Sequence, residues 1–115
     1  MRLPVAVTVD GQGSPPPEVR LALYRIAQEA LNNAAKHAEA SLSTLAARWT
    51  ADSARLIISD DGRGFDPATV SHAHLGLGIM RERADGISAV LSVKSAVGRG
   101  TTIEVNWSAG PAAKP

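Results

Sequence analysis

Four polar side chains share one face of a predicted helix. Glu29, Asn33 and Lys36 are spaced i, i+4 and i+7 in the sequence. Because each residue of an α-helix turns by about 100°, this spacing places all three on one face, with His37 at its edge. A carboxylate, a carbonyl oxygen and an ammonium group together suit a magnesium ion with a polyphosphate, since Mg²⁺ takes hard oxygen ligands and keeps several waters. The simpler interpretation is the solvated side of an amphipathic helix, although Asn is a mediocre residue for a helix interior.

A second polar cluster, Asp60-Asp61-Gly62-Arg63-Gly64, directly follows an apolar run. A carboxylate at the end of a buried strand is suited to accept a hydrogen bond from an exocyclic amine such as that of adenine. Glycines next to it allow a ligand to approach the backbone closely. The alternative is an ordinary Asx turn that joins a strand to a loop.

Two further glycine segments occur later in the chain. Gly76-Leu77-Gly78 precedes a short predicted helix, whose amino end favours anions, and it is flanked by the cations His72, His74, Arg81 and Arg83. Gly98-Arg99-Gly100-Thr101-Thr102 precedes the last predicted strand. Taken singly, the first is a hinge with a helix start and the second is a hairpin turn.

The elements that must position these segments follow from hydrophobic periodicity and from glycine and proline breaks. We expect strands over residues 3–9, 42–49, 54–59, 90–95 and 101–107, with helices over 18–38 and 79–85. The order β-α-β-β-α-β-β combines hairpins with one crossover. It predicts an α+β two-layer sandwich in which helices cover one face of a mixed β-sheet.

The first helix is predicted to bury one stripe against the sheet and to turn its polar face the opposite way. The stripe comprises Leu23, Ala27, Ala30, Leu31, Ala34 and Ala38.

Composition excludes several classes of protein. The 115 residues suit one domain, which we expect over 1–108 with a disordered tail over 109–115. Twelve basic and eleven acidic residues give a net charge of +1, which argues against binding nucleic acid through phosphate neutralisation. The absence of cysteine excludes disulfides and thiolate metal sites. No apolar run approaches the roughly 20 residues of a membrane helix, and no signal peptide is apparent.

Four motifs in a fixed order are more specific than any one of them. IAQEALNNAAKHA (26–38), SDDGRGFD (59–66), HLGLGIMRERA (74–84) and GRGTTIEV (98–105) together resemble the ATP-binding catalytic domain of sensor histidine kinases. That domain has the Bergerat fold of the GHKL ATPase superfamily, which also includes DNA gyrase and MutL. The resemblance covers roughly residues 3–107 and is greatest to the subfamily whose partners are LuxR-type response regulators.

The resemblance implies a role for each matching residue on the phosphate side. Asn33 would help coordinate Mg²⁺, Glu29 occupies the acid position of the helix motif, and Lys36 and His37 would approach the phosphates. Residues 67–75 match the ATP lid. Gly76 and Gly78 would form its phosphate-side hinge, and Leu77 between them is also expected to contribute to nucleotide binding.

On the base side, the resemblance implies that Asp60 reads the adenine amino group and that Thr101 lies near the adenine edge. Gly62 and Gly64 would let the nucleotide lie against the backbone.

The implied activity is the donation of the γ-phosphate of Mg-ATP to a histidine on a separate dimerisation and phosphoacceptor domain. No helical hairpin with a His-acid pair occurs in the chain. We therefore expect an excised catalytic domain or a C-terminal fragment of a larger sensor. It should be monomeric and cytoplasmic, should not autophosphorylate, and should have no direct contact with membrane or nucleic acid. These expectations leave open a membrane anchor elsewhere in the parent kinase. A LuxR-type response regulator is expected as an indirect partner.

Two alternatives remain at this point. A stand-alone serine/threonine kinase of the anti-sigma type shares the same motifs and would phosphorylate a small partner protein. A non-catalytic nucleotide-binding module would bind ATP without transferring phosphate.

Overall fold

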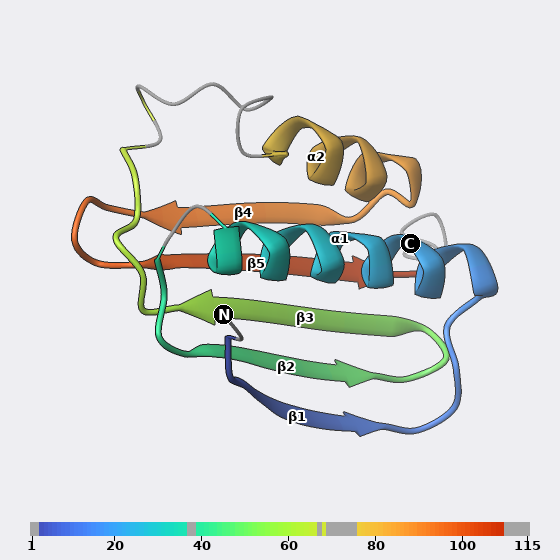
Figure 1. The fold of residues 1–115 in the computed structure, drawn as a ribbon. Helices are drawn as coiled ribbons and strands as arrows, with labels where there is room; N and C mark the ends of the chain where they lie inside the picture. Colours follow the sequence, from blue (N-terminus) through green and yellow to red (C-terminus); the bar gives the residue numbers. More distant parts are fainter. Residues whose placement is uncertain (1–2, 37–38, 67, 69–75, 110–115) are drawn as a thin grey trace.

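The computed structural model describes residues 3–36, 39–66, 68 and 76–109. In this part of the chain, helices and strands follow the predicted order (Figure 1). They are β1 (Val5–Gly11), α1 (Pro17–Lys36), β2 (Ser43–Trp49), β3 (Ser53–Asp60), α2 (Leu77–Gly86), β4 (Val90–Ser95) and β5 (Thr101–Ser108). The predicted α+β sandwich is confirmed, and the predicted ends of its elements differ by at most two residues.

The strands form one mixed sheet in the order β1-β2-β3-β5-β4. β1 and β2 are parallel, so the chain between them must cross over the sheet, and α1 makes that crossover. Every other neighbouring pair is antiparallel. Figure 1 shows α1 and α2 on the same face of this sheet.

Alternation along the two central strands decides which side chains face the helices. In β3 the buried positions are Ala54, Leu56 and Ile58. In β5 they are Ile103, Val105 and Trp107. Because side chains alternate along a strand, Asp60 at the end of β3 and Thr101 at the start of β5 continue the series that faces the helices.

The buried face of α1 is centred differently from the predicted stripe. Its buried residues are Val19, Ala22, Ile26, Ala30 and Ala34. Leu23, Ala27 and Leu31 are only partly buried, and Ala38 lies outside the described residues. The sheet and α2 together cover a broad arc of α1, so a single line of positions does not describe it. Glu29 and Asn33 are consequently half-buried beside the core instead of opposite to it.

The last described residue is tied to the sheet. The Ala109 amide donates a 2.7 Å hydrogen bond to the Asp52 carbonyl oxygen, and Ala109 packs against the core. The rest of the predicted tail, 110–115, lies outside the described residues. Neither α1 nor α2 combines the length and the apolar character needed to cross a membrane.

Candidate functional site

The predicted base-side residues meet where β3 ends. Asp60 pairs in register with Thr101 of β5 on one side and with Ser43 of β2 on the other. Thr101 in turn pairs with Ser95, the last residue of β4. Figure 1 shows the tip of β3 and the β4–β5 turn at the same end of the sheet, where α1 also ends. The fold therefore brings segments distant in sequence to one edge.

Asp60 is a half-buried carboxylate on the helix side of the sheet. Burial raises its pKa, and the neighbouring charge of Asp61 acts in the same direction. Hydrogen bonds from the backbone N–H groups of Gly62 and Thr101 oppose this shift, and the Gly62 amide donates to Oδ1 at 2.8 Å. Such a carboxylate, held by its own backbone and partly removed from water, is suited to accept a hydrogen bond from a bound amine.

The glycine loop after β3 is packed against the β4–β5 turn. Gly64 has φ of 63°, and a Cβ there would overlap the Ala96 carbonyl oxygen. Gly100 has φ of 77°, and a Cβ there would overlap the Asp60 carbonyl oxygen. The two glycine motifs thus form one backbone junction. Glycine is required at position 64 because the backbone of the other motif lies so close to it. Its predicted approach to a nucleotide stays a prediction.

Ser95 is a member of this junction that the sequence analysis did not identify. Its hydroxyl accepts a 2.9 Å hydrogen bond from the Phe65 amide and lies 2.8 Å from the Thr101 hydroxyl. It also donates to the Gly100 carbonyl oxygen at 3.1 Å. The available signal was its position as the last strand residue before the hairpin, directly across from Thr101.

Asp61 has a different role from Asp60. Its carboxylate is exposed and accepts hydrogen bonds from the Ser41 hydroxyl at 2.6 Å, the Ser41 amide at 2.8 Å and the Leu42 amide at 3.0 Å. The Ser41 hydroxyl is the largest of several contacts that lower the pKa of Asp61. Asp61 therefore fixes the start of β2 to the end of β3.

The phosphate-side prediction falls on α1 and on the start of α2. Gly76 has φ of 70°, and a Cβ there would overlap the Glu29 carboxylate, so the two motifs are in direct contact. The first backbone N–H groups of α2 have no partner within the helix, which makes this corner suitable for anionic groups. Asn33 lies one turn from Glu29, and Lys36 is exposed at the end of α1.

Some predicted residues contribute less than expected or lie outside the description. The Leu77 side chain is 4% exposed and belongs to the core, so only its backbone is available to a ligand. Gly78 follows it in the first turn of α2. His37, His72 and His74 lie outside the described residues, as does the predicted lid except Ala68, whose amide donates a 2.9 Å hydrogen bond to the Asp66 carboxylate.

The donor set bears on the predicted magnesium ion. Within residues 3–36, 39–66, 68 and 76–109, no three His, Cys, Asp or Glu side chains gather into a metal-binding group. Asn33, the predicted ligand, lies one helical turn from Glu29 on α1, so that a side-chain amide oxygen and a carboxylate are available near one another. This set fits Mg²⁺ bound by few protein ligands, because that ion usually completes its shell with water and substrate phosphates.

Comparison with known proteins identifies the domain. Residues 18–111 match the family described as histidine kinase-, DNA gyrase B- and HSP90-like ATPases. The signal transduction histidine-protein kinase/phosphatase DegS of Bacillus subtilis is 37% identical over 92 residues, which are 77% of this chain and 24% of DegS. The sensor histidine kinase LiaS of the same organism is 42% identical over 83 residues, covering 72% of this chain and 23% of LiaS.

Solved structures agree with this assignment. The histidine kinase domain of a blue-light activated kinase from Erythrobacter litoralis superposes with a TM-score of 0.62 at 25% identity, covering 89% of this chain and 54% of that one. The ATP-binding domain of PrrB from Mycobacterium tuberculosis shares the fold, with a TM-score of 0.64 at 22% identity over 92% of this chain and 79% of PrrB. This chain belongs to the histidine kinase-, DNA gyrase B- and HSP90-like ATPase family, as an ATP-binding catalytic domain of the histidine-kinase type.

Proposed function

We propose that this domain binds Mg-ATP with its adenine against Asp60 and presents the γ-phosphate to a histidine on a separate phosphoacceptor domain. The observation that carries the proposal is Asp60 itself, a half-buried carboxylate facing the helices in register with Thr101. Asp60 also closes an Asx-type turn, because its Oδ1 accepts the Gly62 amide at 2.8 Å. Its position on the helix side of the sheet, unlike that of exposed Asp61, is what supports a second role in binding.

The phosphate side of the proposed site uses α1 and the start of α2. Asn33 would hold Mg²⁺, which supplies neutralisation of phosphate charge when bound. Lys36 at the end of α1 and the amino end of α2 would place further positive charge near the phosphates. Glu29 packs on Gly76, and this contact would set the position of the amino end of α2 relative to α1.

The proposed reaction needs positioning and charge neutralisation more than covalent help from the protein. A ring nitrogen of the acceptor histidine attacks the γ-phosphorus. The bond between that phosphorus and the β,γ-bridging oxygen breaks, so that phosphohistidine and ADP result.

The acceptor and the downstream partner are part of the proposal. The chain spans about a quarter of the length of DegS and LiaS, and their names describe histidine kinases. The form of the QEALNN and KHA segments supports a LuxR-type response regulator as the final acceptor. The domain would act in the cytoplasm, where ATP and such a regulator are present.

Phosphotransfer in trans tests the function. The domain is mixed with radiolabelled ATP, Mg²⁺ and the separately produced phosphoacceptor domain of its parent kinase. We expect acid-labile label on the acceptor and none on this chain, which should be monomeric in solution. Replacing the acceptor histidine by Gln is the matched control.

Two results would contradict the proposal. Label that stays on this chain through denaturing electrophoresis would contradict the proposal that the acceptor histidine lies on a separate domain. Acid-stable label on a serine or threonine of the acceptor would favour the anti-sigma type of kinase.

A further inference from the structure

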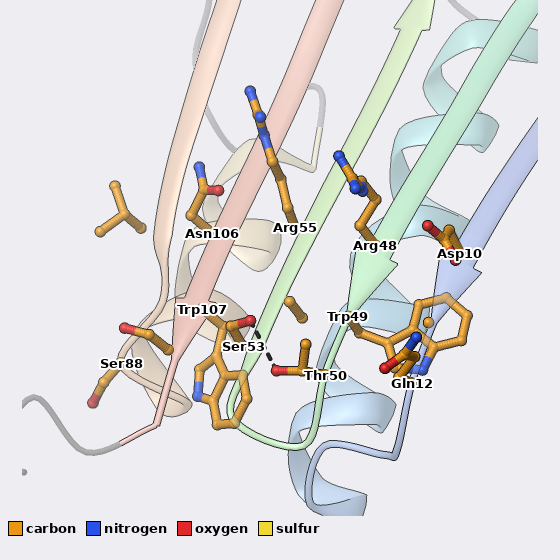
Figure 2. A pocket seen from close by; sticks show the side chains of 14 residues that line it. Asp10, Gln12, Arg48, Trp49, Thr50, Ser53, Arg55, Ser88, Asn106 and Trp107 are labelled. Carbon is orange, nitrogen blue, oxygen red and sulfur yellow. Dashed lines mark hydrogen bonds between the residues drawn. The ribbon is translucent and has the colours of Figure 1, made fainter.

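A groove lies at the end of the sheet opposite to the proposed nucleotide site. It has a volume of about 660 Å³ and is lined by residues from all of the strands, including Arg48, Arg55 and Asn106. Figure 2 shows these side chains next to one another with Asp10, in front of the sheet and away from the helices. Arg55 and Asp60 are five residues apart along β3, so the groove is about 17 Å from the nucleotide end.

Strand register explains why the charges meet there. Asp10 pairs with Arg48, Arg48 with Arg55, and Arg55 with Asn106, so that one row crosses four neighbouring strands. All belong to the series that alternates with the buried one, which places them on the face without helices. Like charges directly opposite on antiparallel strands are unfavourable, and Arg48 with Arg55 is such a pair.

The two arginines are not equally neutralised. Arg55 Nε donates a 3.0 Å hydrogen bond to Glu104, whose carboxylate also accepts from Asn106 at 2.9 Å. No carboxylate of the described residues comes within 4.0 Å of the Arg48 side-chain nitrogens, that of Asp10 included. Arg48 is therefore an exposed guanidinium, beside a second one, that has no ion-pair partner in the described part of the chain.

We infer that this groove binds an acidic segment of a partner protein, with a carboxylate seated between Arg48 and Arg55. A carboxylate matches the planar fork of a guanidinium and would offset the repulsion between the two arginines. The inference does not depend on the proposed phosphotransfer, because none of these residues belongs to the nucleotide end.

The rest of the lining favours a peptide over a nucleic acid. Asp10 lies in the groove and Glu104 binds Arg55, so the positive charge is confined to Arg48 and the arginine beside it. So local a charge suits a single carboxylate better than the continuous charge of a phosphate backbone. Gln12, Ser53 and Asn106 offer hydrogen-bond donors and acceptors of the kind that a peptide backbone can use. Trp49 and Trp107, the only tryptophans of the chain, border the end of the groove, although both belong to the series that faces the helices.

These tryptophans serve as probes next to the groove. The isotope-labelled domain, saturated with Mg-ATP, is titrated with a blocked heptapeptide of Ser residues that carries one central Glu, while the indole N–H and backbone amide resonances are followed. The same peptide with Gln in place of Glu is the matched ligand. We expect shifts at both indoles and along β2 and β3, with at least about tenfold weaker binding of the Gln peptide, the loss of one charged hydrogen bond.

Two variants locate the contact. Arg48→Gln should weaken binding of the Glu peptide about tenfold without changing ATP affinity, since Arg48 holds nothing else in place. Lys94→Gln removes one exposed positive charge from the same sheet face, outside the groove, and should change peptide binding by less than about twofold.

Three outcomes would overturn the inference. One is equal peptide affinity in wild type and Arg48→Gln. Another is peptide binding that occurs only in the absence of ATP and is abolished by Mg-ATP, which would place the peptide in the nucleotide site. The third is tighter binding of a single-stranded oligonucleotide that is lost in Arg48→Gln, which would assign the groove to nucleic acid.

Discussion

The two sides of the loop after β3 carry adjacent carboxylates in opposite situations. On the helix side, burial raises the pKa of Asp60. On the outer side, the Ser41 hydroxyl and the neighbouring amides lower the pKa of exposed Asp61. A lowered carboxylate pKa means that the folded state favours the ionised form, whereas a raised one means that folding disfavours it. The comparison teaches that the setting of Asp61 favours its charge, whereas that of Asp60 disfavours its charge even though the Gly62 amide donates to it. Carboxylates in such settings are candidates for a functional role.

Removing Asp60 should produce the largest effect on ligand binding. Asp60→Ala should weaken ATP binding by about ten- to a hundredfold, because hydrogen bonds with a charged partner contribute roughly 1.5–3 kcal/mol. Isothermal titration calorimetry measures this loss. Asp61→Asn is the matched control and should bind ATP within about twofold of wild type. Equal losses of ATP affinity in both variants would contradict the different roles assigned to Asp60 and Asp61.

Disturbing the junction should affect both stability and binding. Gly100→Ala forces a left-handed residue, at a cost of roughly 1–2 kcal/mol, and its Cβ would displace the Asp60 carbonyl group. We expect a lower midpoint of urea unfolding together with weaker ATP binding. Gly86→Ala is a suitable control, because a Cβ at Gly86 meets nothing within 4 Å. A Gly100→Ala protein with wild-type ATP affinity would show that the junction does not position Asp60.

Asp61→Asn should lower the stability of the fold without affecting ATP binding. The folded pKa of Asp61 lies below its unfolded value, so its contribution is present above the ordinary carboxyl pKa and is lost as pH falls through the folded one. The stability gap between wild type and Asp61→Asn should therefore close on acidification. Chemical unfolding at a series of pH values measures it, and a gap that widens in acid would reverse the assignment.

Asp60→Asn should have the smallest effect on stability, and its sign should be opposite to that of Asp61→Asn. Because the folded pKa of Asp60 is raised, the wild type loses stability as pH rises from the ordinary carboxyl pKa through the folded value. At neutral pH the amide variant should be at least as stable as wild type. Thermal unfolding at neutral and acidic pH checks this, and a large loss of stability at neutral pH would make Asp60 a structural residue.

Much of the fold was predictable because each element has a local signal. Proline before α1 and glycines at the ends of strands gave element bounds close to those observed. The set of buried residues on α1 was harder to predict from the sequence, since the burial of Ile26 depends on where the sheet and α2 pack. Ser95 and the contact of Glu29 with Gly76 depend on packing between distant segments, and the pairing of Arg48 with Arg55 depends on strand register.

The base preference of Asp60→Asn tests the central claim most directly. Guanine presents a carbonyl oxygen where adenine presents its amine, so a carboxylate at Asp60 should favour ATP over GTP. Calorimetry with both nucleotides on wild type and on folded Asp60→Asn gives the two affinity ratios. We predict a preference of about tenfold or more for ATP in wild type, from one charged hydrogen bond, and a markedly smaller ratio in the variant. An unchanged ATP/GTP ratio in the folded variant would remove Asp60 from the adenine site.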